Sequence, residues 1–269
     1  GPPATLRLVF EHPTIRRLAS ALEQAGAGAA ATAVATPQVE GGPPSADLWP
    51  LSATQQDLWL AEQLDPGAQF NLCHAFLFRG EIDKLALEDA LAGIVAEHAV
   101  LRSTVRRDAE GAAAWIEPLR RPVLVTSDLS TEPDPRAAFL AACQREVVRP
   151  FDATRGPLYR FLLCRLGLGR WGLCLVFHHL IFDGLSLVPF GQELGSRYDR
   201  LTGKPGSASA GPAGMYLDYI RSERADLDSA EAAESRRLWR AWLAGAPQAV
   251  EMPTDRPRRS RQDAAGSVH

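Results

Sequence analysis

The most apolar part of the chain, residues 159–177, constrains the fold more than any other segment. It consists of two β-prone runs, Tyr159 to Leu166 and Trp171 to Phe177, which are joined by the sequence GLGR. Two such runs around a short glycine-containing turn are typical of an antiparallel hairpin. Because the second run is apolar throughout, we expect the hairpin to be buried.

Helix-like and strand-like segments alternate on both sides of this hairpin. Ser52 suits the N-cap of a helix from about Ala53 to Leu64, and Asp83 suits the cap of a helix that continues to His98. We expect further helices over residues 134–149, 186–201, 215–225 and 231–243. We expect strands over residues 70–80, 101–105, 114–117 and 123–126.

Charge and hydropathy exclude two classes of partner. The 29 basic and 32 acidic residues give a net charge of −3, so no cationic field attracts a nucleic acid. No apolar run approaches the roughly 20 residues that span a bilayer, so we expect no membrane association. The N-terminal sequence GPPATLRLVF lacks the pattern of an export signal, and we expect a cytoplasmic location.

The first 47 residues differ in character from the rest. Residues 12–24 place apolar side chains at helical spacing behind Pro13, which suits a first helical turn. From residue 25 to residue 47 the sequence consists largely of Ala, Gly, Thr, Pro and Val, without periodicity. This composition predicts a flexible linker between a short amphipathic helix and the main domain.

The sequence HHLIFDG, residues 178–184, is the strongest candidate for chemistry. It lies where the apolar second run of the hairpin ends and a loop begins, which is where a rigid scaffold often presents functional groups. Histidine can transfer a proton near neutral pH, and a carboxylate such as Asp183 can fix its environment. Gly184 would allow a backbone turn that other residues resist.

A metal site is one alternative for the two histidines, and a purely structural role is another. His74 and His98 are distant in sequence, so no further ligand has a helpful spacing. The cysteines are equally scattered, and no two have metal-ligand spacing; they are Cys73, Cys143, Cys164 and Cys174. We interpret them as buried thiols that pack like small hydrophobic residues, rather than as a redox or zinc site.

Six segments together resemble the condensation domains of nonribosomal peptide synthetases, which belong to the chloramphenicol acetyltransferase-like superfamily. HHLIFDG matches the signature HHxxxDG, and PLSATQQDLW (residues 50–59) is similar to the opening motif LSxAQxxxW. EHAVLRS (97–103), PFDATRGPLYR (150–160), MYLDYIRSE (215–223) and MPTDRPRR (252–259) follow in the family's order. In EHAVLRS, Glu97 and Ala99 stand where the family has Arg and Glu, which puts that ion-pairing pattern in question. FEHPTIRRLASAL (10–22) resembles the last helix of a carrier domain.

The resemblance implies an α/β fold, more closely an α+β two-layer arrangement: a chloramphenicol acetyltransferase-like lobe whose mixed sheet is flanked by helices. It divides the chain into the end of a carrier domain (1–25), a linker (26–47), the N-terminal lobe (48–245) and the start of a crossing segment (246–269). Such domains have two lobes with the active site between them. We therefore expect little turnover from these 269 residues alone.

The resemblance also implies the reaction and its residues. The amine of an acceptor aminoacyl thioester attacks a donor acyl thioester, with His179 as the catalytic residue. His178 supports the local structure, Asp183 pairs with an unidentified arginine, and Gly184 lines the path of the substrate. No metal or cofactor is bound directly, because the substrates arrive on the phosphopantetheine arms of carrier domains. The expected partners are upstream and downstream carrier domains and adjacent synthetase modules.

Several alternatives remain open at this level. Epimerisation domains share HHxxxDG, although they usually continue as DGVSWRIL where this chain has DGLSLVPF. Heterocyclisation domains carry an aspartate-rich motif instead, and a noncatalytic carrier-docking module is a third possibility. Ser186 could act as a nucleophile, but a helix cap for the next segment suits it better because no GxSxG sequence surrounds it. Trp59, Trp239 and Trp242 suit the core or an interface better than a substrate platform.

Overall fold

The computed structural model describes residues 48–64, 66–108, 111–204 and 215–247. All of them lie in the unit Gln38–His269. The predicted carrier helix and linker, and all but the first two residues of the predicted crossing segment, lie outside the described residues. The predicted boundaries therefore remain predictions.

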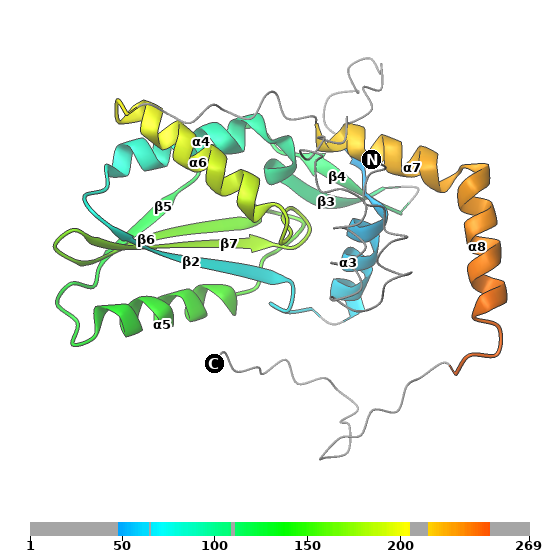
Figure 1. Cartoon of the computed structure of the whole chain (residues 1–269), viewed down its shortest axis with the longest axis horizontal. Helices are drawn as coiled ribbons and strands as arrows, with labels where there is room; N and C mark the ends of the chain where they lie inside the picture. Colours follow the sequence, from blue (N-terminus) through cyan, green and yellow to red (C-terminus); the bar gives the residue numbers. More distant parts are fainter. Residues whose placement is uncertain (1–47, 65, 109–110, 205–214, 248–269) are drawn as a thin grey trace, which may run out of the picture. The chain divides into compact units, whose positions relative to one another are not determined.

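The main sheet has four strands in the order β2-β7-β6-β5 (Figure 1). Their bounds are β2 Asn71–Arg79, β5 Leu124–Asp128, β6 Tyr159–Gly167 and β7 Arg170–His178. β6 and β7 form the predicted antiparallel hairpin, and the turn between them places Gly167 and Gly169 at φ values of 146° and 57°, which glycine tolerates best. β5 pairs with β6 in parallel, whereas β2 pairs with β7 in the antiparallel sense. The expectation of a mixed sheet is confirmed.

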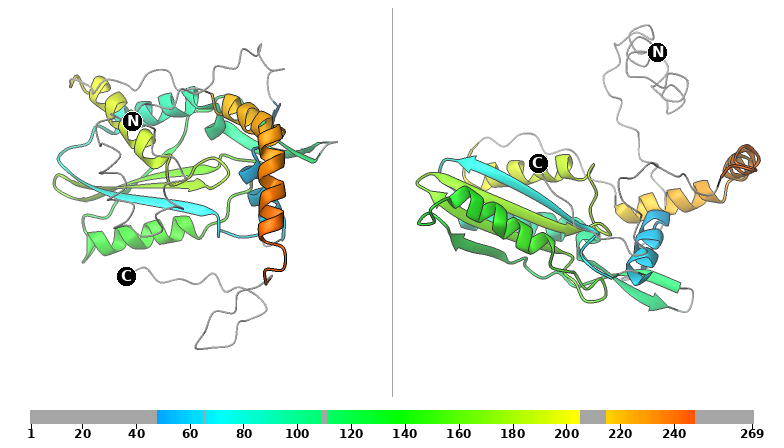
Figure 2. Two further views of the ribbon diagram at one scale, coloured as in Figure 1. Left: turned by 45° about the vertical axis from the view of Figure 1, so that its right-hand side comes forward. Right: turned by 90° about the horizontal axis from the view of Figure 1, so that it is seen from below.

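Helices cover both faces of this sheet, as Figures 1 and 2 show. Helix α5 (Pro135–Val147) lies on one face, and α4 (Lys84–Glu97) and α6 (Leu187–Leu201) lie on the other. Even-numbered residues of β7 face α5: a Cβ on Gly172 would lie 2.8 Å from the ring of buried Phe139. Odd-numbered residues face α6, where the Phe177 ring meets Phe190 edge to face. Burial from both sides explains why the run is apolar throughout.

A second, smaller sheet lies beside the main one. It contains β1 (Leu48–Pro50), β4 (Gly111–Ile116) and β3 (Ser103–Asp108), all antiparallel, and a short 3-10 helix η1 (Ala99–Arg102) leads into β3. The sequence indicated β3 and β4 as extended segments, but not their separation into another sheet. The periodicity of a strand describes its faces and does not identify its neighbour.

Three further helices complete the described chain: α3 (Ala53–Leu64), α7 (Tyr216–Leu227) and α8 (Ala230–Trp242). The two predicted caps are present, because Ser52 Oγ accepts from the Gln55 N–H and Asp83 Oδ1 accepts from the Ala86 N–H. Helix α8 has no buried residue, and Trp239 and Trp242 are 48% and 77% exposed. These two tryptophans are therefore not part of the described core.

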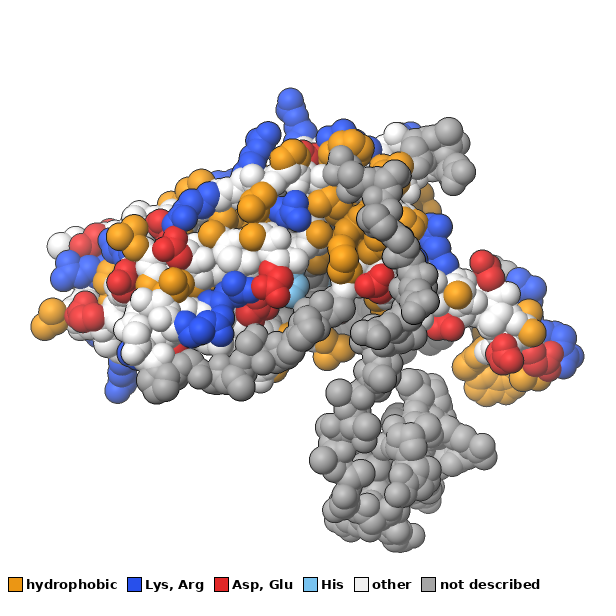
Figure 3. Space-filling model, turned by 90° about the horizontal axis from the view of Figure 1, so that it is seen from above, with side chains coloured by type: hydrophobic (Ala, Val, Ile, Leu, Met, Phe, Trp, Pro, Cys, Tyr) orange, Lys and Arg blue, Asp and Glu red, His pale blue; other side chains and the backbone are white. Residues whose placement is uncertain are grey.

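The surface agrees with the weak net charge. On the face shown in Figure 3, acidic and basic side chains are interspersed, with apolar side chains between them. No helix among the described residues has the length and hydropathy to cross a membrane.

Candidate active site

His178 is the last residue of β7 and is almost completely buried, with 1% of its surface exposed. Its Nδ1 accepts a hydrogen bond of 3.1 Å from the Leu180 N–H, so the ring proton of the neutral imidazole is on Nε2. Nε2 lies 3.3 Å from a carboxylate oxygen of Glu62, which is itself buried on α3. The edges of two phenylalanine rings, Phe70 and Phe151, pack against the imidazole. These contacts hold the His178 ring in place, and its role as a support for the site stays a prediction.

His179 differs from His178 in the surroundings of its side chain, although the backbone N–H of each donates to a carbonyl. Its backbone N–H donates to the Phe70 carbonyl at 2.8 Å, which fixes the main chain against the residue that precedes β2. Its side chain is partly exposed, and its imidazole makes no hydrogen bond with any described residue. The backbone is therefore held while the ring is left available to an external group.

The carboxylate of Asp183 accepts hydrogen bonds from Ser186 in the turn that follows it. One carboxylate oxygen accepts from the Ser186 N–H at 2.8 Å and from the Ser186 hydroxyl at 2.6 Å. The hydrogen bond from this hydroxyl lowers the pKa of Asp183, against the opposing effect of partial burial. No arginine within the described residues forms an ion pair with this carboxylate. The expected arginine partner is thus absent from that part of the chain, and Ser186 takes its place.

The same contacts correct the interpretation of Ser186. It precedes α6 as predicted, but its side chain makes no capping hydrogen bond to that helix. Its hydroxyl donates to Asp183 and accepts from the Asp183 N–H at 3.3 Å, and no described histidine contacts it. A hydroxyl tied in this way to a carboxylate lacks the histidine base that a serine nucleophile needs.

The expectation that Gly184 allows a backbone turn that other residues resist is wrong, whereas its place along the substrate path stays a prediction. Gly184 is not among the glycines with positive φ, so its conformation is open to other residues. A Cβ at this position would meet no atom of the described residues within 4 Å, its two chain neighbours apart. Within the described part of the chain, the space beside Gly184 is therefore open.

The opening motif holds the HHLIFDG loop directly. Gln55 is buried on α3, its side-chain amide donates to the Leu180 carbonyl at 2.7 Å, and its side-chain oxygen accepts from the Ser52 N–H at 3.0 Å. The Tyr216 hydroxyl at the start of α7 donates to Ser52 Oγ at 3.2 Å. Three motifs that are far apart in sequence thus form one chain of hydrogen bonds.

Sequence reasoning missed Gln55 and Glu62 as members of this site. They are seven residues apart, so they lie two turns apart on one face of α3, and both contact the loop. The sequence offers no signal that separates them from Gln56 and Gln63, which have the same spacing and are exposed.

EHAVLRS forms an ion pair of its own. The side chain of Arg197 on α6 contacts both Glu97 and Glu193, and Glu193 also accepts from the His98 ring at 2.7 Å. Burial raises the pKa of Glu193, but the hydrogen bonds from His98 and Arg197 outweigh it and lower the pKa overall. Glu97 therefore connects α4 to α6, although it stands where the family has an arginine.

One group of side chains in the described chain has the geometry of a metal site, and it is not at the histidines. The sulfur atoms of Cys73, Cys143 and Cys174 all lie within 4.8 Å of one another. Hydrogen bonds with the other two thiols lower the pKa of Cys73, whereas the same contacts and burial raise that of Cys174. The prediction that these thiols are buried in the core holds for Cys143 and Cys174, and Cys73 is partly exposed. Their spacing in sequence gave no sign that they meet.

Comparison with known proteins gives a consistent result. The sequence profile of the family described as "Condensation domain" matches residues 45–268. The phosphinothricin tripeptide synthetase PhsC of Streptomyces viridochromogenes is 34% identical over 213 residues, which are 78% of this chain and 20% of PhsC. The probable non-canonical nonribosomal peptide synthetase CymA of Salinispora arenicola is 36% identical over 282 residues, covering all of this chain and 3% of CymA.

Solved structures give the same fold. The first condensation domain of the CDA synthetase superposes with a TM-score of 0.67 at 27% identity, over 78% of this chain and 53% of that one. A variant of the starter condensation domain of the rhizomide synthetase RzmA gives a TM-score of 0.68 at 25% identity, over 74% and 46%. The chain therefore spans about half of these solved domains and a fifth or less of the two synthetases above.

Proposed function

Because the chain belongs to the condensation domain family of nonribosomal peptide synthetases, we propose that it contributes the catalytic half-site for forming an amide between two carrier-bound thioesters. The observation that carries the proposal is the contrast between the two histidines. The backbone and His178 are fixed by buried contacts, whereas the His179 ring is free of hydrogen bonds to described residues and is partly exposed.

In this reaction the acceptor amine attacks the carbonyl carbon of the donor thioester. A C–N bond forms, the C–S bond breaks, and the carrier thiol leaves with the proton that the amine gives up. His179 accepts that proton or holds the amine and the tetrahedral intermediate by hydrogen bonding. A positioned general base contributes about 10² to 10⁴ in rate, so loss of the imidazole is severe without being absolute.

The open space at Gly184 supports a proposal for the route by which substrates arrive. We propose that the phosphopantetheine arms of upstream and downstream carrier domains bring both substrates past this position, and that adjacent synthetase modules supply those carriers. The domain itself needs no bound metal or cofactor for the reaction. Free thiols at all four cysteines suit the cytoplasmic setting that we propose.

The test is a coupling assay with two loaded carriers. The 269-residue chain is assayed alone and after fusion to the remaining half of a condensation domain. We expect coupling only in the fusion, because this chain covers only about half of the solved domains. In the fusion, His179→Ala should reduce coupling by about 10² or more, whereas His98→Ala, which removes a histidine bonded to Glu193, should leave it within a few fold.

Retained coupling in His179→Ala would overturn the catalytic role. Loss of deuterium from the substrate α-carbon without coupling would identify an epimerase. Carrier binding without either reaction would identify a docking module.

A further inference from the structure

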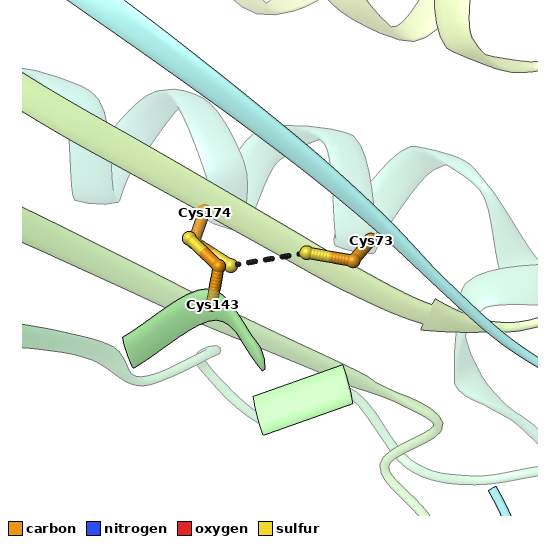
Figure 4. A group of neighbouring side chains, drawn as sticks. All are labelled: Cys73, Cys143 and Cys174. Atoms are coloured by element: carbon orange, nitrogen blue, oxygen red, sulfur yellow. Dashed lines mark hydrogen bonds between the residues drawn. The ribbon is translucent and has the colours of Figure 1, made fainter. Parts of the chain in front are cut away.

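Three cysteines from three separate elements meet on the α5 side of the main sheet. Cys73 is on β2, Cys174 on β7 and Cys143 on α5, and Figure 4 shows their side chains directed toward one another. The Cys73 and Cys174 sulfur atoms are 3.6 Å apart, and all three lie within 4.8 Å. The contact is tertiary, because the three positions are 70 and 31 residues apart in sequence.

These separations fit a shared metal ion. Zinc binds thiolate sulfur at about 2.3 Å in tetrahedral sites, which places two sulfur ligands about 3.8 Å apart. A disulfide between the strands fits less well. Cys73 is paired with Val176 and Cys174 with Ala75, so the two cysteines are diagonal neighbours. Diagonal positions are about 7–8 Å apart, at or beyond the separation that a disulfide bridges without backbone movement.

The three sulfur ligands and the charged side chains near them indicate which class of metal ion would bind. Three sulfur ligands without an oxygen ligand favour soft ions over magnesium or calcium. Three thiolates and a divalent ion carry a net charge of −1. On this side of the sheet, Arg149 and Arg160 both contact Glu146, which leaves one net positive charge, and the charge of Arg160 interacts with Cys174.

A cavity reaches the cluster at one of its three cysteines, Cys174, and neither Cys73 nor Cys143 lines it. Its volume is about 430 Å³, and its lining includes Cys174, Arg160 and Glu146. Cys73, the partly exposed member of the group, lies on β2 at the edge of the described sheet. An ion can therefore approach the cluster from the cavity at Cys174 or from the partly exposed Cys73.

We propose that Cys73, Cys143 and Cys174 bind one thiophilic divalent ion of the zinc group, with its fourth coordination position open to the cavity. Each thiol releases its proton to solvent as its sulfur–metal bond forms, and no electron is transferred. The bound ion ties α5 to two strands of the sheet.

The test uses the reduced 269-residue chain, titrated with Zn²⁺ and separately with Cd²⁺. We expect one ion per chain, thiolate-to-cadmium absorption in the ultraviolet, and a rise in melting temperature. That rise should be about 5–11 °C at a metal concentration one hundred times the dissociation constant. Cys164→Ser is the matched control, because Cys164 is also buried but lies outside the cluster. It should bind like the wild type.

Cys73→Ser removes a ligand at a partly exposed position, so it should fold, and circular dichroism with the metal-free melting temperature verifies this. It should weaken binding at least tenfold and lose the thermal shift. Cys143→Ser and Cys174→Ser should do the same if folded. Binding that is unchanged in Cys73→Ser, or no stoichiometric binding by the reduced wild type, would reject the site.

Discussion

Replacing Gln55 tests whether α3 holds the HHLIFDG loop. Gln55→Leu keeps the size of the side chain but removes its amide. Two buried groups then lose a partner, namely the Leu180 carbonyl and the Ser52 N–H, at 2.7 and 3.0 Å from the amide. Both residues are at most 3% exposed, so water cannot take over these hydrogen bonds.

The expected cost follows from these two contacts. An unsatisfied buried polar group costs about 1–3 kcal/mol, so two cost about 2–6 kcal/mol. The apolar atoms of leucine return about 1–2 kcal/mol. The middle of both ranges gives an expected fall in the free energy of unfolding of about 2.5 kcal/mol, and their extremes allow up to about 5 kcal/mol. The measurement is urea denaturation of the 269-residue chain followed by circular dichroism.

Gln63→Leu provides the matched control, because it makes the same chemical change at an exposed position of the same helix. Exposed substitutions of this kind usually alter stability by less than about 0.5 kcal/mol. If Gln55→Leu and Gln63→Leu unfold at the same urea concentration, the hydrogen bonds of Gln55 do not hold the loop and the reasoning fails.

Three other changes test separate contacts. Glu62→Ala removes the buried carboxylate that lies 3.3 Å from Nε2 of His178, and it should lower the free energy of unfolding by about 0.5–3 kcal/mol in urea denaturation. Ser186→Ala should raise the pKa of Asp183 toward its ordinary value, measured by NMR titration of the carboxyl carbon. The pKa of Asp183 is depressed in the folded wild type. Its charge therefore stabilises the fold above the unfolded-state pKa, and this contribution is lost as the pH falls through the folded-state pKa. Ser186→Ala should bring the two pKa values closer together and so reduce this contribution to the free energy of unfolding. Gly172→Ala forces a methyl group into a buried ring and should lower the free energy of unfolding by about 1–3 kcal/mol.

Each of these has a control within the chain. Glu62→Gln retains an oxygen acceptor and should recover most of the stability lost in Glu62→Ala. Asp128, whose pKa is lowered by hydrogen bonds from Ser130, should titrate unchanged in Ser186→Ala. Gly195→Ala on α6 adds a Cβ that meets no atom of the described residues within 4 Å, its own helix backbone apart, and should be neutral or stabilising by up to about 1 kcal/mol. Equal effects at positions 172 and 195 would contradict the packing described for β7.

Features governed by neighbouring residues were predictable from the sequence. Ser52 and Asp83 cap their helices as expected, because a cap depends on residues within one turn. The hairpin of β6 and β7 was predictable for the same reason, since its turn and both runs are contiguous. The family motifs then gave the mixed sheet and the position of the two histidines.

Features that depend on tertiary contacts were not predictable from the sequence. Glu62 has the composition of a surface residue on a polar helix, and only the position of β7 makes it a buried partner of His178. The three sulfur atoms meet because α5 packs across β2 and β7, which no spacing in the sequence shows. Asp183 found a hydroxyl three residues away where a distant arginine was expected.

The two contacts from α3 fix the number of residues between Gln55 and Glu62. Gln55 and Glu62 reach the loop from positions about 10 Å apart along the helix axis, at 1.5 Å per residue. One residue inserted or deleted between them would rotate one side chain by about 100° relative to the other, so that only one could still face the loop. Substitutions between these two positions should therefore be tolerated better than insertions or deletions. Among natural relatives, the residue types between them should vary while the number of residues stays the same.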